Sequence, residues 1–397
     1  MQAYSGVFKD KTLAVFTVKK IRYYKGEYYT YGGFLSSFYP MTEAFRQTYL
    51  FAHVKSCQPP KSWEKLDSTN IVIIHLFSGR NELEVMLQIF PNIIKSVFYL
   101  LKFRPHYSHC RIPDFTGVYG YFLSRLLGIK TFAQVIADWD AERRMTPYSK
   151  KFFLGTFLRI YYASYVFTER LITKNTISFC QGLVVYDKNG GSHNRNLRLM
   201  ISSSITEKDC IDKIEPFESY RSIIHIARLT GIKNQSFLIE SINRNFHLLK
   251  DCEINLYGEG PLRERLTILI ERLGLKNTRL NGNLPKGELF WETLRDSQLF
   301  ILTSISEGTP KVLLEAMANG VLVVAPNVGG IPYMLGNGSR GFIYEEGNTD
   351  SFDSVLLKVV QSDHLSIRQK ALRYAKENTV ESITTSMLNE LKIYYAE

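Results

Sequence analysis

The chain has 397 residues, of which 45% are hydrophobic and 22% charged, so it is long enough for two domains and too apolar for intrinsic disorder. Its five cysteines include no Cys-x-x-Cys pair, which argues against a disulfide framework or a structural zinc site and fits a reducing compartment. The net charge of +11 lies in the first half, because residues 1–215 hold 29 basic and 17 acidic residues and residues 216–397 hold 20 and 21. A basic half suggests a membrane surface, a phosphorylated substrate or nucleic acid as partner, or else only a solubilising surface.

The N-terminus lacks the order of basic, apolar and small residues that marks a signal peptide. No apolar run reaches about 18 residues, the length that a membrane-spanning helix needs. We therefore expect a soluble or peripheral protein.

In the first half, the apolar pattern predicts a strand early in the chain and then a mixture of strands and helices. Expected strands lie at 12–21, 70–77, 130–138 and 182–187, and expected helices at 42–54, 82–103, 115–127 and 150–172. The segment 149–170 is basic and strongly aromatic, so it is either a helix lying in a membrane interface or one buried under the first sheet.

The second half alternates strands and helices at short intervals. Expected strands lie at 222–229, 252–261, 278–284, 299–308 and 321–332, and expected helices at 235–246, 262–275, 286–297, 310–320, 351–361 and 365–378. This alternation predicts βαβ units and a parallel sheet with helices on both faces, with ligands at the carboxyl ends of the strands. We predict an N-terminal domain at 1–210, a second domain at 216–380 and a final helix within 381–397.

Two glutamates in "SEGTPKVLLEAMANG" raise a chemical question. Glu307 precedes the helix that begins near Pro310, and Glu315 lies about two turns along it. A helix N-terminus suits a phosphate, and Gly308 lets a ligand approach the backbone closely. A nucleotide sugar has hydroxyls on both sides of a diphosphate and would use all these features. The alternative is a capped helix with one exposed glutamate.

Two cations lie upstream in "HIARLTGIKNQ". Arg228 lies at the end of the strand expected at 222–229 and Lys233 just past it, so both would reach the same edge of the sheet. There they would make charge-assisted bonds to a departing diphosphate, or they are ordinary surface cations in a loop.

The stretch from Arg221 to about Gly347 resembles the C-terminal domain of the retaining glycosyltransferases of family 4, also called group 1. The matching pieces, in the family's order, are "ARLTGIKNQ", "LYGEGPLRERL", "LNGNLPKGELF", "SISEGTPKVLLEAMANGVLVVAPNVGGIP" and "GFIYEEGNTD". The resemblance implies a GT-B fold, in which two Rossmann-like domains face each other across a cleft, with the last helix packing back on the first domain. It also implies transfer from a nucleoside-diphosphate sugar with retention of configuration and without a required metal or other cofactor.

The resemblance also implies roles for residues at matching positions. Arg228 and Lys233 would contact the donor phosphates, Glu307 the hydroxyls of the donor sugar, and Glu315 the ribose. Gly308, Thr309 and Pro310 would form the loop around the sugar, and the loop 281–286 would contact the base. Gly32 and Gly33 match a glycine-rich loop that reaches the donor phosphates; the alternative is an ordinary turn.

Some positions depart from the family pattern. Leu322 replaces a common proline and Tyr333 a common acid, but neither touches the donor core. Where many relatives have an acceptor-side histidine, this chain has Arg111; His109 is out of register, and we interpret it as structural. Asp138 starts an Asp-Trp-Asp motif that mimics the metal motif of the other large glycosyltransferase fold. We expect no metal there and assign Asp138, like Arg111, to the acceptor side.

These observations predict a hexosyltransferase that builds a cell-surface polysaccharide or glycolipid of bacterial type, in the cytoplasm or peripherally on the inner face of the membrane. The expected partners are a nucleotide sugar, a glycan or lipid-linked acceptor and an anionic membrane surface, and not nucleic acid, because no nucleic-acid-binding signature accompanies the basic half. The alternatives are a GT-B-like epimerase or phosphorylase, or an inactive protein that binds nucleotide sugars or anionic membranes. A dehydrogenase would need Gly-x-Gly-x-x-Gly after its first strand, and "GEGPLR" has only the first two glycines.

Overall fold

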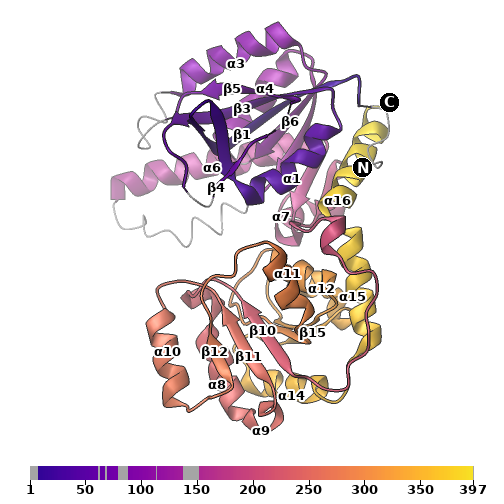
Figure 1. Cartoon of the computed structure of the whole chain (residues 1–397). Helices are drawn as coiled ribbons and strands as arrows, with labels where there is room; N and C mark the ends of the chain where they lie inside the picture. The colour runs from indigo at the N-terminus through magenta and orange to yellow at the C-terminus, as the bar shows by residue number, and fades with distance from the viewer. Residues whose placement is uncertain are drawn as a thin grey trace. The chain divides into compact units, whose positions relative to one another are not determined.

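The structure, a computed structural model, describes residues 8–60, 63–67, 69–78, 88–112, 114–136 and 152–396, with the backbone alone for 152–163. The chain divides into two compact units (Figure 1). Unit 1 is Met1–Met200 with Ile383–Glu397, and unit 2 is Ile201–Ser382.

Unit 1 is built on a sheet whose core strands are all parallel, in the order β5-β3-β1-β6-β7-β8-β9. Their bounds are β1 Thr12–Tyr24, β3 Gln47–Ser56, β5 Ile71–Leu76, β6 Tyr107–Ile112, β7 Lys130–Val135, β8 Ser178–Gln181 and β9 Leu197–Met200. β1 shifts register between Phe16 and Lys20, and its far end forms an antiparallel hairpin with β2 (Glu27–Tyr31), which pairs with β4 (Trp63–Lys65).

Alternate side chains of β1 enter two cores, one on each face of this sheet. Leu13 and Val15 pack with α1 (Gly32–Glu43) and α16 (Val380–Tyr394). Ala14 and Phe16 pack with the other helices. Those are α3 (Ile89–Phe103), α4 (Phe115–Leu126), α6 (Phe152–Asn175) and α7 (Leu183–Lys188). The period of two along β1 therefore divides the helices into two layers.

Two sequence predictions for unit 1 are wrong. The helix expected at 42–54 is the strand β3, because its aromatic and apolar run lies between β1 and β5 and pairs with both. The strand expected at 182–187 is the helix α7. The strand there is the short β8, and Gly182, with φ of 96°, turns the chain into the helix. Neither error could be seen from the apolar pattern, because short buried helices and strands have similar composition.

Unit 2 holds a fully parallel sheet in the order β12-β11-β10-β13-β14-β15. The strands are β10 Ser222–Ile226, β11 Glu253–Tyr257, β12 Thr278–Leu280, β13 Leu299–Ile301, β14 Leu322–Pro326 and β15 Phe342–Tyr344. Its helices are α8 Gln235–Arg244, α9 Phe246–Leu249, α10 Arg263–Arg272, α11 Glu288–Arg295, α12 Lys311–Ala318, α13 Ile331–Met334, α14 Thr349–Val359 and α15 Leu365–Glu377. The predicted alternation of strands and helices in this half is confirmed.

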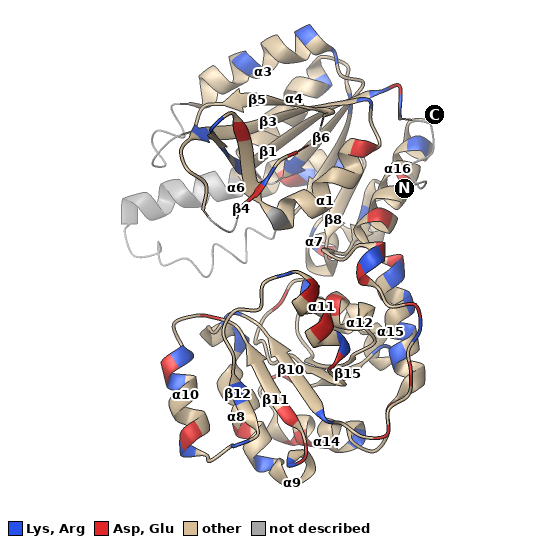
Figure 2. Cartoon of the chain, viewed as in Figure 1, with Lys and Arg blue, Asp and Glu red and all other residues tan. Residues whose placement is uncertain are grey.

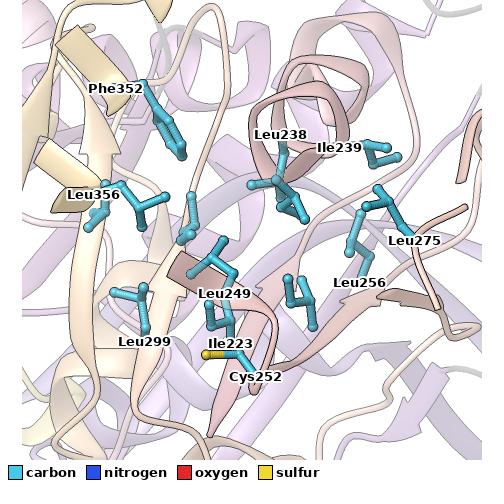
Figure 3. Packing of buried hydrophobic residues seen from close by; sticks show 14 of the residues in the cluster. Ile223, Leu238, Ile239, Leu249, Cys252, Leu256, Leu275, Leu299, Phe352 and Leu356 are labelled. Atoms are coloured by element: carbon cyan, nitrogen blue, oxygen red, sulfur yellow. The ribbon is translucent and has the colours of Figure 1, made fainter. Parts of the chain in front are cut away.

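Helices cover both faces of the unit 2 sheet. On one face, Ile223 of β10 and Leu299 of β13 pack with α8, α10 and α14 through residues such as Leu238 and Phe352 (Figure 3). On the other face, Ile224 joins a second core with α11, α12 and α15. This is the doubly wound arrangement that the alternation predicts.

The units divide between Met200 and Ile201, about ten residues before the boundary predicted between 210 and 216. Ile201 and Ile205 are buried in a core of unit 2, so the chain already belongs to that unit there. At the other end, Met387 and Leu391 of α16 are buried in a core of unit 1.

Both sheets reverse their strand order beside the first strand. In unit 2 the reversal lies between β10 and β13, and in unit 1 between β1 and β6. In open parallel sheets this reversal is where ligands bind, at the carboxyl ends of the strands. Each unit therefore has one predicted binding edge.

Candidate functional site

The binding edge of unit 2 brings together three residues that the sequence analysis singled out. The loop after β10 carries Arg228 and Lys233, and the loop after β13 carries Glu307. Because β10 and β13 are neighbours in the sheet, residues more than seventy positions apart in sequence reach the same edge.

Lys233 and Glu307 form an ion pair across the reversal of strand order. Lys233 Nζ donates to Glu307 Oε1 at 2.5 Å, and the two side chains are 18% and 11% exposed. The same two loops are joined by backbone bonds, since Ile305 N donates to the Ile232 carbonyl at 2.8 Å and Thr303 Oγ1 to the Lys233 carbonyl at 3.0 Å. The charged pair is therefore held in place by the loops before any ligand binds.

Arg228 differs from Lys233, because its side chain is exposed and makes no hydrogen bond or ion pair in the described part of the chain. Its backbone is nonetheless fixed. Gln235 Nε2 donates to the Arg228 carbonyl at 2.9 Å, and a Cβ on Gly258 or Gly260 would lie 1.9 Å or 2.3 Å from the carbonyl oxygens on either side, those of residues 227 and 229. The two glycines of "GEGPLR" thus let β11's loop pack against the Arg228 loop.

The loop from Glu307 to Pro310 is supported by paired glycines after β14. Gly330 N donates to the Gly308 carbonyl at 2.9 Å, and a Cβ on Gly329 would lie 1.7 Å from the Glu307 carbonyl oxygen. A Cβ on Gly308 itself would meet nothing within 4 Å, so this side of the loop faces open space. The helix α12 begins directly after Pro310, and no side chain caps it. Its first N–H groups suit an anion, as the sequence analysis expected.

Glu315 lies on α12 and is buried. Its Oε1 accepts hydrogen bonds from Lys286 Nζ and, at 2.7 Å, from Ser204 Oγ. Lys286 Nζ also lies 5.4 Å from the ring centroids of Phe290 and Trp291, which orient it. The second glutamate is therefore a fixed acceptor with its own cation.

Lys286 and Ser204 are the residues that sequence reasoning missed. Lys286 lies in the loop 281–286, to which we assigned base contacts but no side chain. Ser204 belongs to "ISSSIT" near the boundary, where nothing in the sequence signals a contact with α12. Only the fold brings it to Glu315.

His225 fastens the two central strands together. Its Nδ1 lies 2.8 Å from the Ile301 carbonyl oxygen, and complete burial lowers the pKa of its imidazole to about 4. The ring is neutral at physiological pH, so His225 is a structural link between β10 and β13 rather than a proton carrier.

The binding edge of unit 1 holds a buried cation. Arg111, at the end of β6, is 8% exposed, and its side chain makes no hydrogen bond or ion pair in the described residues. Its guanidinium lies 5.5 Å from the ring centroid of Phe34, in the first turn of α1. Gly32 and Gly33 are the first two residues of that helix, which follows β2 and has no side-chain cap. The structure thus places Arg111 near the start of the helix that the paired glycines begin.

Asp114 lies beside Arg111 and caps α4. It accepts from Gly117 N at 2.8 Å and from Val18 N, after the core part of β1, at 3.4 Å. Burial raises the pKa of its carboxyl to about 7, although these bonds and the nearby Arg111 act in the opposite direction. Near neutral pH the carboxyl is therefore only partly ionised, and it leaves the positive charge of Arg111 partly uncompensated.

His109 is buried in the sheet two residues before Arg111. Its Nε2 lies 3.1 Å from Gln134 Oε1, its ring stacks on Phe132, and burial lowers its pKa to about 3. This agrees with the interpretation of His109 as a structural residue.

Two sequence interpretations fall beyond the described residues. Asp138 lies outside them with its whole Asp-Trp-Asp motif, and so do the side chains at the start of α6 that raised the question of a membrane interface. Among the residues that the structure does describe, no three His, Cys, Asp or Glu side chains are grouped to hold a metal ion. No helix in the described ranges has the length and apolar character to cross a bilayer.

The sequence similarity to a known family lies mainly in unit 2. Residues 206–379 match the family model described as "Glycosyl transferases group 1". The chain is 29% identical over 148 residues to the N-acetyl-alpha-D-glucosaminyl L-malate synthase of Bacillus anthracis, a match that covers 37% of this chain and 38% of that protein. It is 30% identical over 152 residues to the amylovoran biosynthesis glycosyltransferase AmsK of Erwinia amylovora, covering 36% of each chain. The chain thus spans less than two fifths of the length of these curated relatives.

Solved structures resemble the chain over nearly its whole length. The structure of Anabaena Alr3699/HepE in complex with UDP matches with a TM-score of 0.66 and 15% identity, covering 96% of this chain and 100% of that one. The chain has the GT-B fold, with two α/β units each built on a parallel sheet.

Proposed function

We propose that this chain is a glycosyltransferase that transfers a sugar from a nucleoside-diphosphate sugar to a glycan or glycolipid acceptor. The observation that carries the proposal is the set of Arg228, Lys233 and Glu307 at the binding edge of unit 2, inside the region that matches group 1 glycosyl transferases. Support for the donor class comes from the Anabaena neighbour, whose structure holds UDP.

The donor diphosphate would lie against the start of α12, between Arg228 and Lys233. Negative charge grows on the diphosphate as the bond to the sugar breaks, and cations fixed in advance stabilise that charge without reorganising. Lys233 is fixed by Glu307 and by its loop. Arg228 is unpaired among the described residues, so it can turn to the ligand without losing a protein contact.

Glu307 would accept hydrogen bonds from the hydroxyls of the donor sugar. Its Oε1 already accepts from Lys233, but a carboxylate has about four acceptor positions, so Oε2 remains available. The open space beside Gly308 leaves room for the sugar on this side of the loop. Thr309 and Pro310 would complete the wall around it.

Glu315 would bind the ribose hydroxyls in the same way, with Lys286 and Ser204 holding its other oxygen. Lys286 is then a positioning residue, because it acts on the nucleotide through Glu315. This arrangement predicts that a Lys286 variant binds the nucleotide more weakly but keeps its specificity for the donor sugar.

The finer features of the reaction are part of the proposal. We infer retention of anomeric configuration, through an oxocarbenium-like state, with the departing phosphate helping to deprotonate the acceptor and no metal ion required.

The buried Arg111 leads us to infer that the acceptor carries an anionic group, either phosphate or carboxylate. A buried guanidinium without a hydrogen-bond partner among the described residues is costly until an anion binds it. A cell-surface glycan is the proposed product, with support from the amylovoran biosynthesis relative. We place the reaction in the cytoplasm.

The first test is thermal melting with UDP, GDP, ADP and their common sugars, with and without magnesium. A ligand at about 100 times its Kd stabilises the folded protein by about 2.7 kcal/mol. We expect one nucleotide to raise the Tm regardless of magnesium, and Glu315→Ala and the double variant Arg228→Ala, Lys233→Ala to abolish the shift. Arg279→Ala, an exposed cation of the same unit, is the matched control and should keep it.

The identified donor is then incubated with acceptor panels, and the product's anomeric configuration is read by NMR. Transfer with retention supports the proposal. A nucleotide shift without transfer, but with epimerised or phosphorolysed sugar, would assign the protein to the epimerase or phosphorylase alternatives. The absence of a shift with every nucleotide would contradict the donor site.

A further inference from the structure

The helix α3 of unit 1 turns apolar residues to the core and also carries a second apolar stripe on its exposed side. Its exposed residues include Phe90, Ile94, Phe98 and Leu101, which are 76%, 68%, 58% and 52% exposed. With 3.6 residues per turn these four lie within an arc of about 80°. The polar residues Asn92 and Ser96 instead face the protein and are buried.

The buried polar residue Asn92 explains how α3 holds its place without its apolar stripe. Asn92 Oδ1 accepts from Phe77 N at 2.8 Å, and its Nδ2 donates to the Phe77 carbonyl at 3.1 Å, which fastens the helix to the end of β5. Further along, Tyr99 and Phe103 stack, and Phe103 stacks on Tyr49 of β3. The helix is thus anchored by other residues, including the buried Leu100, while the four side chains of the stripe stay more than half exposed.

The described residues around the stripe carry positive charge. Lys95 and Lys102 lie on α3 and Arg104 follows it, and the described residues 88–112 include no Asp or Glu. Figure 2 shows α3 with Lys and Arg in blue and no acidic segment. Lys95 lies 5.0 Å from the ring centroid of Phe77, which is itself half exposed, at the end of the helix where the stripe begins.

A cavity of about 610 Å³ opens where α3 ends. Leu101, the last residue of the stripe, lines it together with the end of α4. Among the described residues, the cavity lining includes the cationic Lys11, Arg104 and Lys130, together with His106, and no Asp or Glu. The neighbouring Asp10 pairs with Lys11 at 3.0 Å, so the remaining charge is still positive. Apolar side chains and an adjoining cationic cavity together match a lipid surface, whose acyl region is apolar and whose headgroups carry phosphate.

We propose that unit 1 docks on an anionic lipid bilayer through the exposed stripe of α3, with lipid phosphates in the basic cavity at the helix's C-terminal end. A second copy of the chain fits this surface poorly, because pairing two such faces would bring like charges together. The docking surface is separate from the nucleotide site, so it does not rest on the proposed transferase activity. It places the membrane contact on α3, whereas the sequence analysis looked for it at 149–170.

The test is co-sedimentation of the full chain with vesicles of phosphatidylcholine alone or mixed with phosphatidylglycerol. We expect binding to the mixed vesicles that weakens as salt rises, because headgroup attraction is screened. The double variant Phe90→Ser, Phe98→Ser should lower the partition coefficient at least tenfold. Lys102→Gln with Arg104→Gln should lower binding to mixed vesicles and remove much of the salt dependence.

The matched control is Ile268→Ser with Leu289→Ser, which removes two apolar residues of unit 2 that are 57% and 63% exposed. It should bind vesicles like the unchanged protein. All variants are checked by Tm and by the nucleotide-induced shift, which the α3 variants should retain because they change exposed residues of unit 1. Equal vesicle binding by the α3 variant and the control would overturn the proposal. So would a dimer that the α3 variant converts to monomer, since the occupant would then be a second copy.

Discussion

The binding edges of the two units differ in how their charged side chains are paired. In unit 2, each carboxylate has its own cation: Glu307 pairs with Lys233 and Glu315 with Lys286. In unit 1, the buried Arg111 has no hydrogen-bond partner in the described residues, and the nearby Asp114 is held partly protonated. Each edge lies at a reversal of strand order in its own sheet, so the two edges share their topology and differ in their side chains. The carboxylates of unit 2 are paired before a ligand arrives, whereas the buried cation of unit 1 is only partly compensated by Asp114.

The largest expected effect comes from removing Arg228 and Lys233, the two cations proposed to bind the donor diphosphate. Each of Arg228→Ala and Lys233→Ala should lower kcat by about 100-fold, and the pair together by about 10⁴-fold, because fixed charges stabilise the departing diphosphate. Steady-state kinetics with the identified donor measures this. Arg279→Ala is the control, and a double variant with nearly normal kcat would contradict a role for Arg228 and Lys233 in the reaction.

The second prediction concerns pH and belongs to unit 1. The pKa of Asp114 is raised by burial to about 7, so the folded protein binds a proton that the unfolded chain has released between about pH 4 and 7. As pH rises through this window, the free energy of unfolding of the unchanged protein should therefore fall relative to that of Asp114→Asn. The fall should be on the order of 3–4 kcal/mol and should level off above pH 7.

Urea unfolding at several pH values compares the two proteins. Asn keeps the cap on α4, because its side-chain oxygen still accepts from Gly117 N. Asp350→Asn, an exposed residue of α14, should run parallel to the unchanged protein. If the curves of the Asp114 variant and the unchanged protein stay parallel from pH 4 to 8, the carboxyl is ionised throughout and the contrast between the units disappears.

The third prediction tests how firmly the Glu307 loop is supported. Gly329→Ala should cost about 2–3 kcal/mol, because φ is 54° and the new Cβ would lie 1.7 Å from the Glu307 carbonyl oxygen. Gly308→Ala should change stability by less than about 1 kcal/mol, since its Cβ meets open space. Thermal melting compares them, and nucleotide affinity should fall in both. Equal destabilisation would mean that the loop does not rest on the paired glycines.

The smallest expected effects are on the stability of the ligand-free protein. They compare the two units directly, because a cation removed from unit 2 and one removed from unit 1 should change stability in opposite directions. Lys233→Met leaves Glu307 without its cation and should cost about 1–2 kcal/mol of stability in the ligand-free protein. Arg111→Met removes a buried charge that lacks a hydrogen-bond partner, so it should leave stability unchanged or raise it by about 1 kcal/mol, while weakening the acceptor interaction. Urea unfolding without ligand decides the sign, and a clear loss in Arg111→Met would show that the guanidinium is already compensated.

The accuracy of the sequence predictions differed between the two units for a physical reason. In unit 2, strands and helices are short, regular and bounded by glycine or proline, so their periodicity and the spacing from Glu307 to Glu315 could be recognised. In unit 1, the segment 42–54 has an apolar run that fits a helix, and only pairing with strands on both sides makes it β3. The segment 182–187 fits a strand, and only the turn at Gly182 makes it α7.

The sequence by itself determined the two-unit α/β architecture and the position of Arg228, Lys233, Glu307 and Glu315 at strand ends and along one helix. It could do so because periodicity, turn residues and local spacing are properties of neighbouring residues. Only the tertiary structure decided the partners of these side chains: Lys233 with Glu307, Lys286 and Ser204 with Glu315, and for Arg111 the ring of Phe34 but no hydrogen-bond partner among the described residues. It also decided that α3 leaves one stripe of apolar residues exposed while Leu100 is buried, because burial depends on what packs against a helix and not on the helix's own composition.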